Sequence, residues 1–463
     1  MRFVLQNSAH LWFIYFLKFL LKDLATMIRS QLENFMQQIG ENSIAIIPAA
    51  REVTRSYDTE FRFRQDSDFY YLTGFPEPDA IAVVMPSHPE THFVLFVRPR
   101  DKEKETWYGR RFGVEGAVSE FGASKAFDVA EFSKEIAGFI NGKEKLYFRF
   151  GVHSEIDQTL LNIFHDFRIR GRKGFYAPPV IIDPGTLLHE SRLIKTPEEL
   201  EIMRQSADIA AEAHLAAMKS ARPGMNEFEV EALIEYEFKK RGATGAAYNS
   251  IVAAGANACI LHYVENNALM RDGDLVLIDA GAEYKAYASD ITRTFPVNGK
   301  LTNAQRDIYD AVLRVEEACI KETRTGVTIK QRQDKSIELL TEEMLRLGIL
   351  QGKTEEIIEK KEYEKFYMHG VGHFLGLDVH DAGRYFVDPK SEQSRPFAPG
   401  MVLTVEPGIY VPPDAENVPD KYRGIGVRIE DDVLVTENGQ EIFTSKVPKY
   451  AEEIEELMAN ARK

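Results

Sequence analysis

The sequence predicts a mixed α/β (α+β) protein with two domains, and three observations support this fold class. A chain of 463 residues exceeds what one hydrophobic core usually holds. The first half alternates short β-branched runs with amphipathic segments, and the second half repeats one order of helices and strands. Prolines and glycines separate the two halves near residue 190. We therefore predict domains at 27–190 and 191–463, preceded by an extension at 1–26.

The overall charge and the cysteine content limit the classes of function. Acidic residues outnumber basic ones by 72 to 57, a net charge of −15, which disfavours nucleic acid and anionic membranes as partners. The two cysteines, Cys259 and Cys319, form no metal-like spacing and no disulfide framework. We therefore expect a protein of a reducing compartment, the cytoplasm.

The first 26 residues stand apart from the rest of the chain. Lys18 and Lys22 interrupt their apolar run, which is too short to span a bilayer and is followed by no convincing signal-peptide cleavage site. We expect a poorly packed extension and no stable membrane anchor. The folded protein is predicted to start at Met27 with an amphipathic helix whose apolar residues are Ile28, Leu32, Phe35, Met36 and Ile39.

The N-terminal domain contains three segments rich in β-branched residues, at 43–48, 79–85 and 91–97, which we predict to be strands. The segment 62–75, R-F-R-Q-D-S-D-F-Y-Y-L-T-G-F, combines aromatic and charged residues. Such a segment is more often a packed edge, but a ligand site is the alternative.

The C-terminal domain is predicted to begin with a well-capped helix. Thr196 is the expected N-cap, Pro197 occupies the first helical position, and Glu199 completes a capping box. His214, on the buried stripe of this helix, is expected to be a wall residue rather than a ligand. A helix, a turn and a second helix then recur, which suggests two similar halves around a shared sheet. The expected helices cover 197–221 and 227–241, then a stretch from the capping box of Thr302 and Gln305 to Glu322, and one ending at Gly348.

The first chemical signal is a pair of aspartates, Asp279 and Asp290, in two strand-like runs joined by a short connection. A hairpin turn centred between Tyr284 and Lys285 would place the two aspartates opposite each other, although no Asn-Gly turn signature supports this register. Two like charges on one face destabilise a sheet unless a cation lies between them. For an isolated pair of this spacing, a turn cap and a solvated residue would be the ordinary explanation.

A second pair, Glu406 and Glu430, interrupts two apolar strands. A carboxylate in a buried strand has to be paired or metal-bound, because an isolated charge is too costly in a low-dielectric interior. The neighbouring Asp431 and Asp432 are expected to be solvated. Arg428 shares the face of Glu430 by strand alternation and could orient or neutralise it.

Three histidines, His369, His373 and His380, lie between these pairs in Y-M-H-G-V-G-H-F-L-G-L-D-V-H-D. A spacing of four residues puts the first two on about the same face of a helix or a strand, and the glycines allow a ligand to approach the backbone. A lone histidine is more often structural. Three of them beside two carboxylate pairs favour a catalytic site.

The combined donor set is dominated by hard oxygens and lacks thiolates. It favours manganese, magnesium, cobalt or iron over structural zinc, with catalytic zinc as an alternative. Two such ions can activate water and polarise an amide carbonyl. The residues therefore predict a hydrolase.

These motifs resemble those of the pita-bread metallopeptidases, and specifically the Xaa-Pro aminopeptidase (aminopeptidase P) family. Five motifs occur in the family's order, I-D-A-G, S-D-I-T-R-T-F, H-G-V-G-H-F-L-G-L-D-V-H-D, V-E-P-G-I-Y and R-I-E-D-D, and the resemblance extends over nearly everything from Met27 onward. It implies a creatinase/prolidase-like α/β domain followed by a pita-bread domain with a pseudo-symmetric antiparallel sheet. The implied activity is hydrolysis of the bond between an N-terminal residue and a proline at the second position of a peptide.

The resemblance also implies cofactors, residue roles and an assembly. The cofactors would be two divalent ions, manganese first, with cobalt, zinc or iron as alternatives, and the assembly a homodimer or homotetramer. Glu406 would be the general base, and His369 and His380 would act on the substrate carbonyl and the proline side. His262, Tyr410 and Arg428 would support the substrate site. The implied metal ligands are Asp279, Asp290, His373, Glu406 and Glu430, with Asp290 and Glu430 shared by both ions.

Three other functions fit parts of this pattern. A prolidase would use the same ligands on Xaa-Pro dipeptides, and the aromatic motif at 62–75 favours the aminopeptidase by resemblance alone. A methionine aminopeptidase fits less well because of the large N-terminal domain. An inactive pita-bread binding protein is disfavoured by the complete set of ligands.

Overall fold

The computed structural model describes residues 25–388 and 390–463, and the chain forms two compact units, 1–190 and 191–463. The extension expected at 1–26 lies outside the described residues except for its last two. The predicted first helix is observed over 25–39, with Leu32, Phe35 and Ile39 buried. None of the helices seen in the described ranges has the length and apolar content needed to cross a bilayer.

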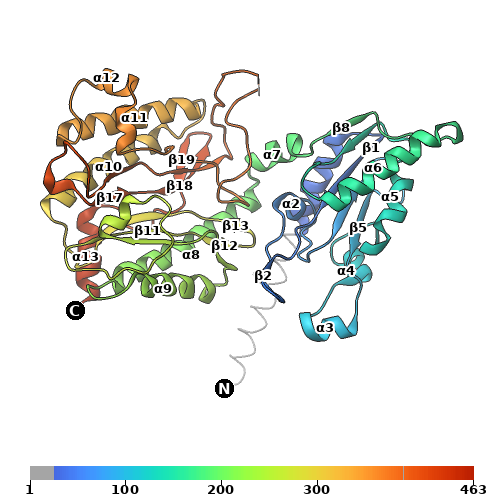
Figure 1. Cartoon of the computed structure of the whole chain (residues 1–463), viewed down its shortest axis with the longest axis horizontal. Coiled ribbons are helices and arrows are strands. Elements are labelled where there is room, and N and C mark those ends of the chain that lie inside the picture. The colour runs from blue at the N-terminus through green and yellow to red at the C-terminus, as the bar shows by residue number, and fades with distance from the viewer. Residues whose placement is uncertain (1–24, 389) are drawn as a thin grey trace. The chain divides into compact units, whose positions relative to one another are not determined.

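The N-terminal unit is built on one six-stranded sheet with the order β6-β5-β4-β1-β7-β8 (Figure 1). Strand β4 runs antiparallel to both of its neighbours, and the other pairings are parallel. The segments predicted as strands form β1, β4 and β5, which confirms them. The bounds are β1 Ser43–Pro48, β4 Ile81–Val84, β5 Phe93–Val97, β6 Lys125–Asp128, β7 Lys145–Tyr147 and β8 Val180–Ile182.

Helices α5 (Phe132–Ile140) and α6 (Ser154–Ile169) pack their apolar residues on alternating strand residues such as Ile44 and Ile46, so they cover one face of the sheet. The segment 62–75 contains α2 (Ser67–Thr73), whose N-cap Asp66 accepts from the Phe69 amide at 2.8 Å. Phe69, Tyr71 and Leu72 are buried in this segment. The other elements are β2 Thr54–Ser56, β3 Thr59–Glu60, α3 Lys102–Tyr108, α4 Gly113–Ser119 and α7 Gly185–Leu193, in which the two units meet along the chain.

The C-terminal unit repeats one order of elements twice, as predicted. Its strands lie between the helix pair α8 and α9 and the pair α10 and α11 (Figure 1). The first half contains α8 Pro197–Ser220, α9 Glu227–Lys240, β9 Gly245–Ala246, β10 Ile251–Ala254, β11 Leu275–Asp279, β12 Ala282–Tyr284, β13 Tyr287–Ala288 and β14 Thr292–Pro296. The second contains α10 Asn303–Glu322, α11 Ile329–Leu347, α12 Thr354–Glu359, β15 Val402–Val405, β16 Gly408–Val411, β17 Ile425–Arg428, β18 Asp431–Thr436 and β19 Gly439–Ile442, followed by α13 Ala451–Ala461.

The predicted helix ends of this unit are confirmed. Thr196 and Glu199 form a reciprocal capping box at α8, and Thr302 and Gln305 form one at α10. Gly348 ends α11 with φ 73°, a left-handed conformation in which a side chain would be strained. His214 is buried on α8, where its Nε2 lies 3.0 Å from the Ala280 carbonyl oxygen. Burial lowers its pKa to about 4, as suits a neutral wall residue.

The register predicted for the first carboxylate hairpin is wrong by two residues. Asp279 pairs with Thr292 rather than with Asp290, and Tyr284 pairs with Tyr287. The turn residues between the two tyrosines have φ values of 49° and 69°. Positive φ at both central positions defines the type I′ turn that suits a two-residue hairpin. The turn was misplaced because Lys-Ala carries none of the residues that usually mark this geometry.

Arg293 on β14 joins the two halves of the C-terminal unit. Its guanidinium is fully buried and donates to the backbone carbonyls of Thr292, Glu430, Val447 and Pro448 and to the Asp431 carboxylate. Asp431 also accepts from Lys449 at 2.7 Å. The expectation that Asp431 and Asp432 are solvated is therefore wrong, since both are buried. Burial by itself would raise the pKa of Asp431. The positive charges of Arg293 and Lys449 outweigh this effect and hold the pKa well below its usual range, so the buried carboxylate is tolerated.

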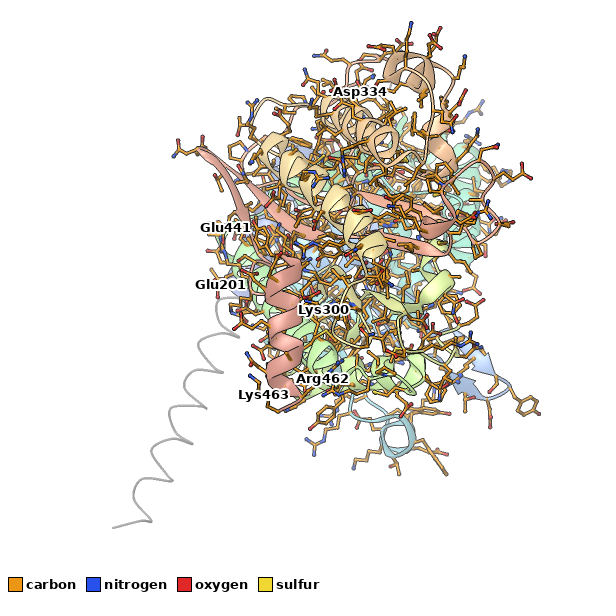
Figure 2. All side chains as sticks on the ribbon, turned by 90° about the vertical axis from the view of Figure 1, so that its left-hand side faces the viewer. Glu201, Lys300, Asp334, Glu441, Arg462 and Lys463 are labelled. Atoms are coloured by element: carbon orange, nitrogen blue, oxygen red, sulfur yellow. The ribbon has the colours of Figure 1, made fainter. Side chains whose placement is uncertain are left out.

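Ion pairs on the surface fasten the last elements of the chain. Figure 2 shows Lys300 and Arg462 beside α13, where the Lys300 ammonium pairs with Glu455 and Arg462 donates to the Val297 carbonyl at 2.8 Å. Glu441 on β19 accepts two hydrogen bonds from Arg204 of α8 at 2.7 and 2.8 Å. Such exposed pairs contribute little each, and the apolar face of α13 supplies most of the attachment.

A second buried ion-pair cluster anchors the segment that contains His380. Asp381 accepts from Arg192 at 2.6 Å and from Lys195 at 3.0 Å, and the side chains of Asp381 and Lys195 are each only 1% exposed. Burial alone would raise the pKa of Asp381, but Lys195 and Arg192 outweigh it and hold the pKa below its ordinary value of 3.8.

The Arg293 contacts predict the effect of a charge-conserving substitution. Arg293→Lys should lower the free energy of unfolding by about 2–4 kcal/mol, because an ammonium cannot reach all these acceptors and each unpaired buried group costs about 1–3 kcal/mol. Urea denaturation of the two proteins measures the difference. Unchanged stability would show that the acceptors do not depend on the guanidinium.

The depressed pKa of Asp381 predicts the pH dependence of its contribution. The contribution is fully present above the unfolded-state pKa of about 3.9 and is lost as pH falls through the lower folded-state pKa. The unfolding free energies of the wild type and Asp381→Asn should therefore differ by a constant amount above about pH 5 and converge below about pH 4. Denaturation curves across pH test this, and a gap that widens on acidification would contradict it.

Candidate metal centre

Four carboxylates of the C-terminal unit lie at breaks in its strands. Asp279 ends β11 just before β12, and Asp290 lies between β13 and β14. Glu406 lies between β15 and β16, and Glu430 between β17 and β18. The sequence predicted charges within strands, whereas the structure puts them where the ladder is interrupted. Such breaks redirect side chains and are common beside active sites.

The two aspartates converge in spite of the shifted register. The Tyr248 hydroxyl donates to Asp279 at 2.7 Å and also contacts Asp290. Arg428 donates to the other oxygen of Asp279 at 2.5 Å. An even shift of two residues keeps both aspartates on the same face, which explains why the convergence was predicted even though the pairing was wrong.

Glu406 and Glu430 face each other across the second half of the sheet. The pairings of β15 with β18 and of β16 with β17 share one register, which places the two glutamates opposite each other. Thr292 donates from its hydroxyl to Glu430 at 2.6 Å, and the Glu430 amide donates to the Thr292 carbonyl at 3.0 Å. These hydrogen bonds hold the second pair of carboxylates, Glu406 and Glu430, next to the strand that follows Asp290 of the first pair.

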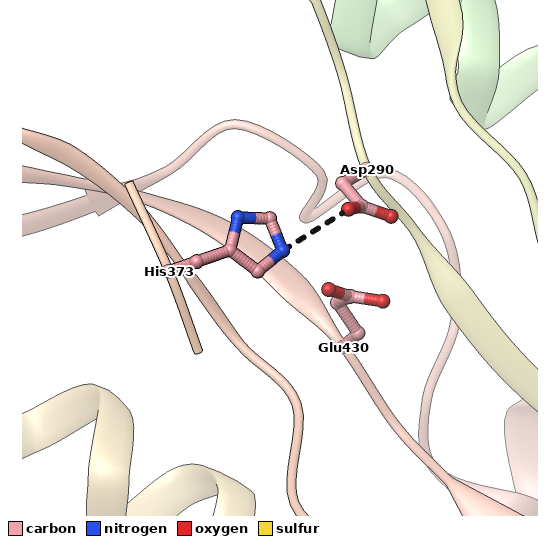
Figure 3. A group of neighbouring side chains, drawn as sticks. All are labelled: Asp290, His373 and Glu430. Carbon is pink, nitrogen blue, oxygen red and sulfur yellow. Dashed lines mark ion pairs between the residues drawn. The ribbon is translucent and has the colours of Figure 1, made fainter. Parts of the chain in front are cut away.

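His373 completes the cluster, as Figure 3 shows for Asp290, His373 and Glu430. One ligand atom from each of these three residues lies within 4.8 Å of the others. The Nε2 atom of His373 is 3.5 Å from Asp290 and 3.6 Å from Glu406. Its Nδ1 atom lies 3.0 Å from the Phe374 carbonyl oxygen, which fixes the ring with Nε2 toward the carboxylates.

The electrostatics of this cluster show a shortage of positive charge. Burial and the neighbouring carboxylates raise the pKa of Glu430 well above its usual range and that of Asp290 above its ordinary value. Burial raises the pKa of Glu406 to about 7. Burial would lower the pKa of His373, but Asp290 and Glu406 outweigh it and raise the pKa to about 9. The extra proton on His373 therefore supplies positive charge that a bound metal ion would otherwise provide.

The donor set therefore fits divalent cations. It consists of carboxylate oxygens and one imidazole nitrogen, with no thiolate, on side chains that are largely buried and aimed at one another. A cation at this place would let the carboxylates ionise together. His373 would lose its proton on binding.

A cavity of about 630 Å³ opens above the cluster. The cavity is lined by the five predicted ligands together with His262, His369, His380 and Arg428. The Nε2 atom of His369 lies 2.8 Å from the Tyr410 hydroxyl, to which Arg428 donates at 3.1 Å. Burial and the Arg428 charge lower the pKa of His369 to about 4, so this imidazole is neutral near pH 7.

Every residue predicted for the site except Tyr410 lines this cavity, and Tyr410 is fully buried with its hydroxyl against His369. His369 and His373 occupy an irregular segment rather than a helix or strand. Three residues of the site were not predicted: Thr292, which binds Glu430, and Tyr248 and Tyr385, which line the cavity. Thr292 could have been found, because it follows Asp290 by two residues and such positions share a strand face. Tyr248 and Tyr385 carried no signal in their neighbouring residues.

The chain matches two family models. The model of metallopeptidase family M24 covers residues 201–437, and the model of the aminopeptidase P N-terminal domain covers residues 28–147. A curated Xaa-Pro aminopeptidase from Escherichia coli is 47% identical over 429 residues, which is 92% of this chain and 96% of that protein.

Solved structures of aminopeptidase P resemble the whole chain. The aminopeptidase PepP of Pseudomonas aeruginosa has a TM-score of 0.92 at 45% identity, covering 95% of this chain and 98% of that one. A zinc-substituted Escherichia coli aminopeptidase P bound to product has a TM-score of 0.91 at 46% identity, covering 95% and 99%. The predicted pita-bread fold of the C-terminal unit is confirmed. The chain belongs to the Xaa-Pro aminopeptidase (aminopeptidase P) family of the M24 metallopeptidases.

Proposed function

We propose that this chain is a dinuclear metal-dependent aminopeptidase that hydrolyses the bond between the N-terminal residue and a following proline. The observation that carries the proposal is the convergence of four carboxylates and His373 at one cavity. The 47% identity to the Xaa-Pro aminopeptidase of Escherichia coli supports the same reaction.

The ligands proposed for the two ions are Asp279, Asp290, His373, Glu406 and Glu430. Divalent ions would supply Lewis acidity toward the scissile carbonyl and an activated water. We propose manganese as the resident metal, because hard oxygen donors dominate the set, with cobalt, zinc and iron as alternatives. Asp290 and Glu430 are proposed to be shared, which agrees with their place where the two halves of the sheet meet.

Glu406 is the proposed general base. Its carboxylate lines the cavity, where it could take a proton from a water activated by the ions and pass it on. Thr404 lies 3.4 Å from one of its oxygens, and His373 lies 3.6 Å from the same oxygen. The position of Glu406 between two strands leaves the carboxylate facing the cavity.

The histidines of the cavity wall are proposed to bind the substrate as neutral groups. Burial lowers the pKa of His380 and that of His369, so both imidazoles line the cavity without adding a charge. A proline after the scissile bond makes that bond a tertiary amide without an N–H. The site therefore has to recognise the shape of the ring, for which apolar wall residues such as Leu261 and Val379 are available.

A prolidase is the alternative, because it would use the same ligands.

Two further properties stay predictions. Family resemblance predicts a homodimer or homotetramer, and the cysteine usage predicts a location in the cytoplasm.

One assay tests the metal requirement and the substrate class together. Metal-stripped protein should release no N-terminal residue from Xaa-Pro-Yaa peptides, and reloading with manganese should restore the activity, because no other group on the cavity wall replaces the Lewis acid. Amino-acid release from tripeptides and from Xaa-Pro dipeptides is followed side by side. Hydrolysis of dipeptides alone would identify a prolidase.

Substitution of the proposed base gives a second test. Glu406→Ala should lower kcat by at least about 10³-fold, since it removes a general base and one metal ligand. Glu437→Ala, which removes an exposed carboxylate of the same unit, serves as the control. Near-normal rates of Glu406→Ala in manganese would refute the role assigned to Glu406.

A further inference from the structure

Glu227, the first residue of α9, is a buried carboxylate outside the metal centre. Its Oε1 accepts from the Ala254 amide at 2.7 Å and from the Asn257 side chain at 3.0 Å. Its Oε2 accepts from the Tyr263 hydroxyl and from the Ala268 amide, each at 2.8 Å. Four neutral donors and the N-terminus of α9 therefore stabilise one fully buried charge.

All four donors belong to a single segment, 254–268, which we call the His262 loop. The Glu227 amide also donates to the Ala268 carbonyl at 3.0 Å, so both the backbone and the side chain of Glu227 hold the loop. One carboxylate thus bonds to the start, the middle and the end of a segment that is irregular apart from Ala254, the last residue of β10, and the short 3-10 turn at Gly255–Cys259. Donors to an ionised acceptor form stronger hydrogen bonds than donors to a neutral one.

The His262 loop forms one wall of the cavity through Leu261, His262 and Val264. Tyr263 is 6% exposed and points back to Glu227, whereas His262 is exposed at the cavity. The position of the His262 imidazole therefore depends on the backbone of the loop. Glu227 holds that backbone through Tyr263, the residue that follows His262.

We propose that Glu227 is a positioning residue for the peptidase reaction, which fixes the His262 loop and so sets where the His262 imidazole meets the substrate. The proposal rests on the function proposed above, in which His262 contacts the peptide. Glu227 is not among the residues that line the cavity, and its side chain bonds to the loop instead. It acts through the loop.

A double-mutant cycle tests this path. Glu227→Gln conserves the size of the side chain but turns one acceptor into a donor, which leaves a loop amide unpaired. In otherwise wild-type, manganese-loaded protein it should lower kcat/KM for an Xaa-Pro-Yaa peptide by about tenfold, mainly through KM, because small misplacements of binding groups are costly. In a His262→Ala background the same change should alter kcat/KM by less than about twofold.

Glu229→Gln is the matched control. It makes the same chemical change two residues away, where Glu229 caps α9 through the Asn226 amide at 2.7 Å without touching the loop. Its kcat/KM should stay within about twofold of the wild type. An equal loss from Glu227→Gln in both His262 backgrounds, or no loss in either, would overturn the proposal.

Hydrogen–deuterium exchange separates this proposal from the proposed function. Glu227→Gln should speed amide exchange in residues 254–268 and leave the segment 369–373 unchanged, while Glu229→Gln should not affect the loop. If the wild type hydrolysed no Xaa-Pro peptide, the proposed function would be refuted, whereas the exchange measurement would still test whether Glu227 anchors the loop. Unchanged exchange in the loop of Glu227→Gln would refute the anchor independently of activity.

Discussion

Four carboxylates, of which Asp290 and Glu430 are buried and Asp279 and Glu406 largely so, share one small volume, and much of the C-terminal unit can be understood from this constraint. Burial, together with their mutual repulsion, raises the pKa values of Asp290, Glu406 and Glu430, so the folded chain holds an unfavourable arrangement that a cation would relieve. Within the protein, Arg428 and a protonated His373 supply part of the missing charge. Stability is thus linked to the ligand that the site is built to hold.

The rest of the unit provides the rigidity that this arrangement needs. Each carboxylate lies at a break in a strand, where the ladder does not hold it, so contacts between elements have to fix it instead. Arg293 ties the backbone of Glu430 to β14, and Thr292 joins the same glutamate from the other half. Glu227 holds the His262 loop in the way that Arg293 holds the sheet. In both cases one buried charged side chain forms hydrogen bonds with the backbone of another segment. Preorganised sites commonly depend on such supporting residues.

The buried groups divide between two electrostatic roles. Acidic groups face the place where cations would bind, whereas burial keeps the imidazoles of His369 and His380 neutral toward the substrate. A neutral imidazole beside a cation centre adds no positive charge that would oppose the binding of the metal ions. This division fits a substrate whose scissile nitrogen has no hydrogen to offer, because recognition then depends on the carbonyl and on ring shape.

The sequence alone determined what short-range chemistry controls. The capping boxes at Thr196 and Thr302 and the strands β1, β4 and β5 follow from neighbours within a few positions, and the short motifs were enough to mark the candidate carboxylates and histidines. Tertiary structure decided the register of the first hairpin, the burial of Asp431 and the contact of Tyr248 with both aspartates. The burial of Asp431, for example, depends on Arg293, which is 138 residues away in the sequence. A local pattern carries no information on such partners, because the low-dielectric interior that pairs them exists only once the two halves have met.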